Sequence, residues 1–214
     1  NIQYQADKHK LSADAISAVL PCLPLQTGLY FQSQLNSVHG YTFSTQLYFN
    51  QAPDADILQQ ALNLTLQQYP QLAAYFALDQ QGQACQIIPN LADEHSATWP
   101  MQVSNFTLLT DEQAQARQQQ LIYQMATAKF DPAKSLALQQ AMLNAHLILN
   151  GEHSVLIVSA HHLVIDGWSL PVCLKALQQN YQSLLQTQPV QPECFASSYQ
   201  ALVELIHHSD KALA

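Results

Sequence analysis

The segment EHSVLIVSA, residues 152–160, is an almost unbroken apolar run with the length of a strand. A strand with one face in water alternates apolar and polar residues, whereas a strand that is apolar throughout needs cover on both faces of its sheet. Helix-like and strand-like segments alternate along the rest of the chain. The sequence therefore predicts an α/β fold in layers, with a sheet flanked by helices, and disfavours a helical bundle or a β-sandwich.

The periodicity of apolar residues assigns most of the chain to helices and strands. YTFSTQLYF alternates with a period of two, as a half-buried strand does, and the turn DQQGQ is expected to join two further strands as a hairpin. Asp54 or Asp56 can cap a helix that Pro70 ends, and Thr110 can cap another. We expect strands over residues 41–49, 72–78, 84–89, 136–150 and 152–160, helices over 25–35, 54–70, 110–130, 166–186 and 197–214, and a short apolar turn broken by Pro21 and Pro24.

Charge and hydropathy exclude several classes of function. The formal net charge is -8, with only seven Lys and Arg residues, so no nucleic-acid-binding surface is expected. No basic cluster indicates a membrane surface, and no stretch reaches the roughly 18 apolar residues that a membrane span requires. The N-terminal sequence NIQYQADKHKLSADAI has no apolar signal region. We therefore expect a soluble, cytoplasmic protein.

The cysteines lack the spacing of a metal site and lie in mostly apolar sequence, so we expect buried free thiols of a reducing compartment. They are Cys22, Cys85, Cys173 and Cys194. Near the C-terminus, His207 and His208 are expected to be exposed to solvent rather than bound to a metal.

The segment SAHHLVIDGWSL, residues 159–170, lies where the predicted buried strand ends and a helix begins. Functional residues gather at such junctions because a rigid strand fixes the loop that follows it. His161 and His162 point to opposite sides of a strand-like backbone, which disfavours a shared metal ion, and no glycine-flanked nucleophile indicates a catalytic triad. Two interpretations stay open. Either the histidines and Asp166 are structural caps, or one imidazole faces a cavity while Asp166 and Gly167 shape the turn.

This segment resembles the HHxxxDG signature of condensation domains in nonribosomal peptide synthetases, with His161, His162, Asp166 and Gly167 at the four fixed positions. Further segments resemble that family's other motifs, in the family's order. LPCLPLQTGLYFQSQL is similar to its PLQxGxxF helix, LQQALNLTLQQYPQLAAYF to the helix and strand around RHPxLRxxF, and KFDPAKSLALQQAMLNAHLIL to its FDL turn and the strand beyond. The likeness covers nearly the whole chain from about Val19 onward.

The resemblance implies a fold similar to chloramphenicol acetyltransferase, in which two α/β lobes form a V with the active site between them. By this resemblance, residues 13–195 are the N-terminal lobe, one half of the V, and residues 1–12 are a linker or N-terminal extension. Residues 196–214 are then a helix that crosses towards a C-terminal lobe, which the chain lacks. We accordingly expect a fragment of a longer protein.

The resemblance also implies a reaction. Condensation domains join two substrates, each tethered to a carrier protein through phosphopantetheine, when an acceptor amine attacks a donor thioester and an amide forms. The partners implied are an upstream donor carrier protein, a downstream acceptor carrier protein and the C-terminal lobe, with no cofactor bound by the lobe itself. Imidazole changes its protonation between about pH 5 and 8, and by resemblance His162 deprotonates or positions the acceptor amine.

The remaining motif residues are expected to act mainly on structure. His161 should pack or hydrogen-bond on the other face of the strand, and Asp166 should fix the loop without transferring protons. Gly167 should permit a tight turn and a close approach of substrate to the backbone. Ser169 should cap the helix or contact the acceptor, and Trp168 should pack or contact substrate.

The chain departs from the family pattern at its arginines. Where the second motif usually reads RHPxLR, the chain has Gln68, Tyr69 and Ala73, and where the FDL segment usually closes with arginine, it has Gln139. In the family an arginine generally holds the motif aspartate, so Asp166 is expected to lack that partner in this lobe. Backbone N–H groups and hydroxyls can satisfy this carboxylate, the missing lobe can supply a cation, or the domain is partly degenerate.

Three other functions compete with amide formation. An epimerization domain shares the histidine motif, although DGWSLP fits condensation better than a DGVSW-like continuation. A stand-alone acyltransferase of the wider HxxxD superfamily is disfavoured by the doubled histidine. A non-catalytic lobe that only docks a carrier protein stays open because of the missing arginines. Among condensation domains, LPLQTGLYF and HHLVIDGWSLP lean towards the type that takes a D-configured donor.

Overall fold

The computed structural model describes residues 2–35, 41–91, 98–139, 141–151, 153–187 and 193–213. The helices are α1 (Ile2–His9), α2 (Pro24–Leu35), α3 (Ala55–Gln68), α4 (Asp111–Ala126), α5 (Pro132–Leu138), α6 (Ser169–Leu185) and α7 (Ala196–Leu213), with short 3-10 turns at Ala13–Ala15 and Pro70–Ala73. The strands are β1 (Ile16–Pro21), β2 (Thr42–Tyr48), β3 (Tyr75–Leu78), β4 (Ala84–Pro89), β5 (Met101–Asn105), β6 (Leu143–Leu149) and β7 (Val155–His161).

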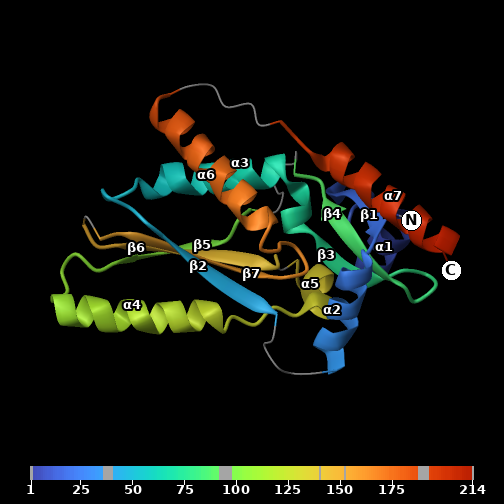
Figure 1. Cartoon of the computed structure of the whole chain (residues 1–214), viewed down its shortest axis with the longest axis horizontal. Helices are drawn as coiled ribbons and strands as arrows, with labels where there is room; N and C mark the ends of the chain where they lie inside the picture. The colour runs from blue at the N-terminus through green and yellow to red at the C-terminus, as the bar shows by residue number, and fades with distance from the viewer. Residues whose placement is uncertain are drawn as a thin grey trace.

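A four-stranded mixed sheet forms the middle layer of the molecule, in the order β2-β7-β6-β5. Strand β7 is antiparallel to both of its neighbours, whereas β5 runs parallel to β6. Helix α4 covers one face of this sheet, and α3 and α6 cover the other (Figure 1). All seven residues of β7 are buried, so the α/β layers that the apolar run predicts are confirmed.

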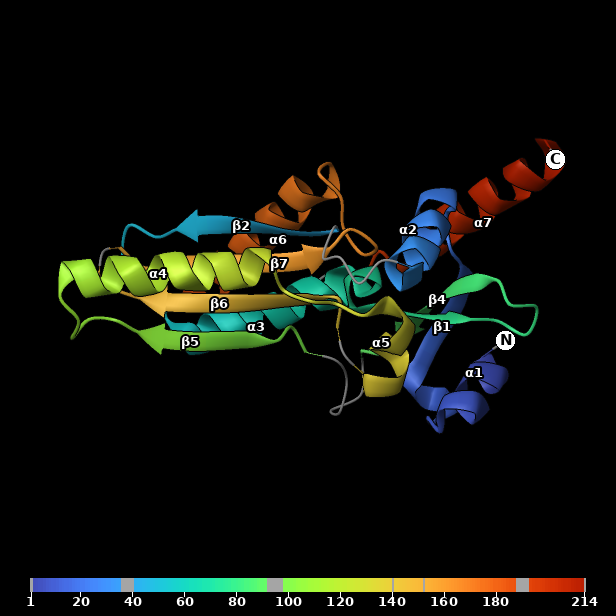
Figure 2. The ribbon, with the colours of Figure 1, turned by 90° about the horizontal axis from the view of Figure 1, so that it is seen from below.

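A smaller antiparallel sheet, in the order β1-β4-β3, lies at one end of the layered part. Helix α7 leads away from the four-stranded sheet along this end of the molecule (Figure 2). Val203 of α7 is fully buried in the main core, and the backbone N–H of Phe195 donates to the carbonyl of Gln68 at the end of α3. The exit helix is therefore fastened to the lobe at its N-terminal half.

The signals at helix ends predicted several boundaries correctly. The Asp54 carboxylate accepts from the backbone N–H of Ile57 at 2.9 Å and begins α3. Thr110 and Gln113 form a capping box at the start of α4. In the hairpin between β3 and β4, Gly82 takes a φ of +76°, a left-handed conformation that glycine adopts readily.

Other expectations were wrong. The short apolar turn around residues 16–21 is strand β1, because pairing with β4 satisfies its backbone and Pro21 stands at its end. Residues 136–138 belong to α5 instead of a strand, since Asp131 caps a helix that starts at Pro132. Strand β5 was not predicted. It lies at the edge of the sheet, and because its side chains are exposed or only half-buried, its sequence lacks the apolar pattern of a strand.

The N-terminal segment, expected to be a linker or extension, contains helix α1. Its Ala6 is buried against the smaller sheet, and the amide of Gln5 donates to the carbonyl of Leu78 at 3.2 Å. A polar side chain can pack inward when it finds such a partner, which the polar composition of this segment does not reveal. Among the described residues, no helix has the length and hydropathy needed to cross a membrane.

We predict that Leu147→Ala in β6 lowers the free energy of unfolding by about 2–5 kcal/mol, because its side chain is fully buried and leaves a cavity. The matched control is Leu108→Ala, which removes a side chain that is 98% exposed and should change stability by less than about 0.5 kcal/mol. Urea unfolding followed by circular dichroism measures both. Equal effects of the two substitutions would contradict this packing.

Candidate functional site

The two histidines of the motif lie at the end of β7 and face opposite sides of the sheet. The Ser159 hydroxyl donates to the Met125 carbonyl of α4, so position 159 faces the α4 layer, and His161 follows on the same side. The backbone N–H of His161 donates to Met142 beside β6, and that of His162 donates to Tyr41 beside β2. Hydrogen bonds to both neighbouring segments thus fix the backbone that carries the pair.

His161 is buried and closes the loop after the strand. Its Nδ1 accepts a hydrogen bond from the backbone N–H of Leu163 at 3.1 Å. Only an unprotonated ring nitrogen can accept. Burial, with a smaller contribution from the charge of His162, lowers the pKa of His161 from 6.5 to about 4. The inner imidazole is therefore neutral at physiological pH.

His162 is exposed and lies on the face covered by α3 and α6. Its ring stacks on Phe43 of β2, with centroids 5.0 Å apart and planes at 29°. Its Nδ1 lies 3.3 Å from the carbonyl oxygen of Ile165, which can only accept, so this contact places the proton on Nδ1. The lone pair of Nε2 is then available to bind a proton from another molecule.

Asp166 is exposed, and its carboxylate is hydrogen-bonded within its own turn, with no ion pair to a cation among the described residues. Its Oδ1 accepts from the backbone N–H of Ser169 at 2.7 Å, from that of Trp168 at 3.1 Å, and from the Ser169 hydroxyl. These hydrogen bonds, led by the hydroxyl of Ser169, hold the pKa of Asp166 below its ordinary value. Of the three explanations considered for the missing arginine partner, the structure agrees with the first, in which backbone N–H groups and a hydroxyl satisfy the carboxylate.

The other motif residues differ from expectation in their detail. Ser169 is the first residue of α6 and not its cap, because the Asp166 carboxylate holds the free N–H groups of that turn. Trp168 is 90% exposed, so the expected packing is absent in this lobe. Gly167 does not adopt a positive φ, and a Cβ there would meet open space, so neither the turn nor the packing of this chain requires glycine.

A pocket of about 430 Å³ opens beside His162. The loop after β7, the start of α2, the end of α3, α6 and α7 line it, and Asp166 and Ser169 lie at its rim. Sequence reasoning did not assign three polar side chains of this pocket to the site: Gln26, Gln71 and Tyr199. The available signal for Gln26 was its fixed position in the PLQxGxxF motif.

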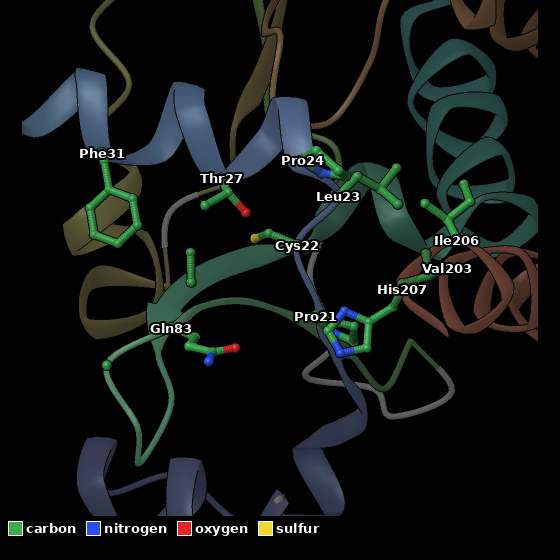
Figure 3. A pocket seen from close by; sticks show the side chains of 12 residues that line it. Pro21, Cys22, Leu23, Pro24, Thr27, Phe31, Gln83, Val203, Ile206 and His207 are labelled. Carbon is green, nitrogen blue, oxygen red and sulfur yellow. The ribbon is translucent and has the colours of Figure 1, made fainter. Parts of the chain in front are cut away.

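A second cavity of about 380 Å³ lies between β1, α2, the β3–β4 hairpin and α7 (Figure 3). Cys22 lines it, but burial, and to a lesser extent Cys85, raises the pKa of the Cys22 thiol to about 12, so that this cysteine stays protonated and is a poor nucleophile. His207 also lines this cavity and is half-buried, so its expected exposure was wrong, whereas the side chain of His208 lies outside the described residues.

The four cysteines are free, as expected, although Cys194 is exposed and not buried. In the described part of the chain, no three His, Cys, Asp or Glu side chains gather in a way that could hold a metal ion. The motif thus presents one accessible imidazole, His162, and the carboxylate of Asp166 at a largely apolar pocket that also holds uncharged polar groups such as Gln26 and Gln71.

The layered α/β lobe, with an accessible imidazole just beyond the end of its buried central strand, has a fold that solved condensation domains share. The family model described as Condensation domain matches residues 16–210, and the chain belongs to that family.

Similar relatives are named as peptide synthetases or synthases, and this chain matches a short part of each. Vanchrobactin synthetase VabF of Vibrio anguillarum is 33% identical over 202 residues, and surfactin synthase subunit 2 of Bacillus subtilis (strain 168) is 26% identical over 176 residues. These alignments cover 93% and 81% of this chain, respectively. The chain spans only 7% and 5% of the length of those two relatives.

Two solved structures show the shared fold. The first condensation domain of the CDA synthetase superposes with a TM-score of 0.70 at 21% identity, over 84% of this chain and 44% of that one. The epimerization domain from the third module of tyrocidine synthetase B superposes with a TM-score of 0.67 at 19% identity, over 87% and 39%. This chain therefore matches less than half of each solved domain.

We predict that His161 makes the stability of the 214-residue chain depend on pH between about 6.5 and 4. The folded pKa lies below the unfolded value, so the unfolded chain binds this proton first as the pH falls, and stability is lost in that window. His161→Asn keeps an acceptor for the N–H of Leu163 but does not titrate. Between pH 7 and 4.5 the wild type should lose about 2–3 kcal/mol more than this variant.

Urea unfolding at a series of pH values measures that difference. The control, His153→Asn, replaces an exposed histidine and should keep the wild-type pH dependence. A His161→Asn variant whose stability falls with pH as steeply as the wild type would show that the inner imidazole is not held neutral.

Proposed function

We propose that this chain is the N-terminal lobe of a condensation domain that forms an amide between two carrier-bound substrates, with His162 acting on the acceptor amine. One observation carries the proposal. His162 faces the pocket with its ring seated on Phe43 and its Nδ1 against the Ile165 carbonyl, which leaves Nε2 free to take a proton. Family membership supports the reaction class, and the geometry supports Nε2 of His162 as the acting atom.

The proposed reaction balances without a cofactor. The neutral acceptor amine attacks the carbonyl carbon of the donor thioester, a C–N bond forms, and the C–S bond breaks. The amine proton passes to Nε2 of His162 and then to the leaving thiolate, so the products are an amide and a free thiol. A base placed in this way contributes typically ~10²–10⁴-fold to the rate.

Positioning of the two substrates is the larger part of the proposed mechanism. A thioester is already activated, and holding two reactants in line can lower a barrier by up to ~7–11 kcal/mol. The phosphopantetheine arms of an upstream and a downstream carrier protein would deliver the donor and the acceptor to the pocket. In this proposal Asp166 fixes the loop through its hydrogen bonds to Ser169, and takes no proton itself.

The rim of the pocket supports a second lobe as a partner. Leu25, Val172 and Leu202 line the pocket, yet 73%, 53% and 50% of their surfaces are exposed. Apolar side chains gathered at one opening commonly mark a surface that another body covers. The solved condensation domain of the CDA synthetase is more than twice as long as its matched part. We infer that the C-terminal lobe covers this rim and completes the substrate pocket.

We predict that His162→Ala in the complete domain lowers the rate of amide formation by about 10²–10⁴-fold, because the amine loses its proton acceptor. Donor- and acceptor-loaded carrier proteins are mixed with the domain, and the mass of the acceptor carrier is followed. The control is His153→Ala, since His153 is exposed and lies at the other end of β7.

The mass readout separates the competing functions. A dipeptidyl gain in the wild type that is lost in His162→Ala supports the proposal, and a gain that persists in the variant removes His162 from the chemistry. No gain in the wild type would favour a lobe that only docks carriers. Inversion of an aminoacyl centre leaves the mass unchanged, so chiral chromatography of the amino acid released from the carrier tests for epimerization, whose fold this chain shares.

We also predict that the 214-residue chain, although folded, forms no amide when mixed with the same loaded carriers. Its pocket lacks the walls that would hold two substrates in line, and positioning supplies most of the proposed effect. The complete domain at equal concentration serves as the positive control. Turnover by the isolated chain at the rate of the complete domain would contradict the two-lobe site.

A further inference from the structure

A row of hydrogen-bonded polar side chains runs along the pocket. It leads from α7 to the loop between β7 and α6, residues 162–168, which we call the histidine loop. The hydroxyl of Tyr199 donates to Oε1 of Gln86 at 2.8 Å. Nε2 of Gln86 donates to the carbonyl of Pro21 at 3.0 Å and to Oε1 of Gln26 at 3.3 Å. The amide of Gln26 then reaches the carbonyl of Leu163 at 2.8 Å. Four separate elements therefore meet through these side chains.

The orientation of the Gln26 amide follows from its partners. Its Oε1 accepts from the backbone N–H of Leu23 at 2.9 Å and from Gln86. Its Nε2 faces the Leu163 carbonyl, which can only accept. Gln86 is fully buried, so its amide is held by fixed partners and cannot turn to water. The position of the Gln26 donor is thus determined by the smaller sheet and α7.

The acceptor of this hydrogen bond is the residue directly after His162. The N–H of Leu163 donates to Nδ1 of His161, and its carbonyl accepts from Gln26. Both peptide groups of Leu163 are therefore fixed, and its side chain is only 2% exposed. His162 can keep its ring on Phe43 only while the backbone that follows it stays in place.

We infer that Gln26 is a positioning residue for His162, acting through the carbonyl of Leu163. The oxygen and the nitrogen of its side-chain amide have different partners. Oε1 caps the start of α2, where a glutamine at the third helical position commonly accepts the N–H of the cap residue. Nε2 makes no hydrogen bond that caps this helix. It donates to the carbonyl of Leu163 in the histidine loop, 137 residues away along the chain. The expected loss of turnover rests on the function proposed for His162, whereas the expected displacement of the His162 ring from Phe43 does not.

Gln26→Glu and Gln26→Met both remove the hydrogen bond to the Leu163 carbonyl, but they differ in charge and in helix capping. Gln26→Glu keeps the cap acceptor and adds a charge, while Gln26→Met adds no charge and loses the cap. Their matched control is Gln32→Glu, an exposed position of the same helix. Because the first two variants differ in charge and in capping, an effect common to both reports the lost donor to Leu163.

The first readout is the contact between the rings of His162 and Phe43 in the 214-residue chain, measured as nuclear Overhauser effects. We expect these effects to weaken at least twofold in both Gln26 variants and to persist in Gln32→Glu. The second readout is turnover of the complete domain with loaded carriers. Because a displacement of ~1 Å can cost ~10²-fold, we expect a tenfold or larger loss at saturating carrier, with half-saturation unchanged.

Circular dichroism and thermal unfolding show which variants are folded. An effect common to both folded Gln26 variants supports the role, and one folded variant without the effect is enough to refute it. Unchanged ring contacts in a folded Gln26 variant would overturn the positioning role, whatever its turnover. Full turnover in such a variant, when His162→Ala abolishes turnover, would overturn the catalytic part. Weakened contacts together with an active His162→Ala domain would instead leave the positioning intact and refute the function proposed for His162.

Discussion

The burial of β7 on both faces is the constraint on which the site depends. Helix α4 on one side and α3 with α6 on the other hold this strand along its whole length. Strand β7 ends at His161, and His162 is the first residue of the loop beyond it, so the two adjacent side chains continue the alternation of the strand and point into different surroundings. His161 lies on the covered side and His162 at the pocket, so two identical residues acquire different chemistry from adjacent positions.

The surroundings of His161 also decide which charge lies next to His162. Two adjacent histidines that were both protonated would repel each other, and each would resist the second charge. Burial keeps His161 neutral near pH 7, and its Nδ1 is occupied by the N–H of Leu163. The inner histidine therefore fixes the loop as a neutral group and places no positive charge beside His162 near pH 7.

Local signals in the sequence predicted the parts of the fold that local physics decides. Apolar periodicity found β7 and the long helices, and the caps Asp54 and Thr110 gave their starts. Strand β1 was missed because Pro21 at its end and Pro24 just beyond it are typical of turns, and because its pairing with β4 is a tertiary contact. In the site, the motif located His162, whereas the Gln26–Leu163 hydrogen bond joins positions 137 apart, which no periodicity can indicate. Exposure of Trp168 likewise depends on what lies around the lobe, not on the local sequence.

Two of the three positions where the family pattern has arginine carry glutamine in this chain, Gln68 and Gln139, and the third is Ala73. Gln68 accepts from the amide of Asn180 at 3.0 Å, and beside it Tyr69, at the histidine position of the motif, stacks on Phe195 with centroids 5.3 Å apart. Gln139 takes a left-handed conformation at the end of α5, where it closes the helix. Asp166 finds its donors within its own turn, and an exposed carboxylate with such donors stays ionised without an arginine. Hydrogen bonds from backbone N–H groups and a hydroxyl thus hold the Asp166 carboxylate in this lobe, and because the residue is exposed, no buried charge requires a counterion.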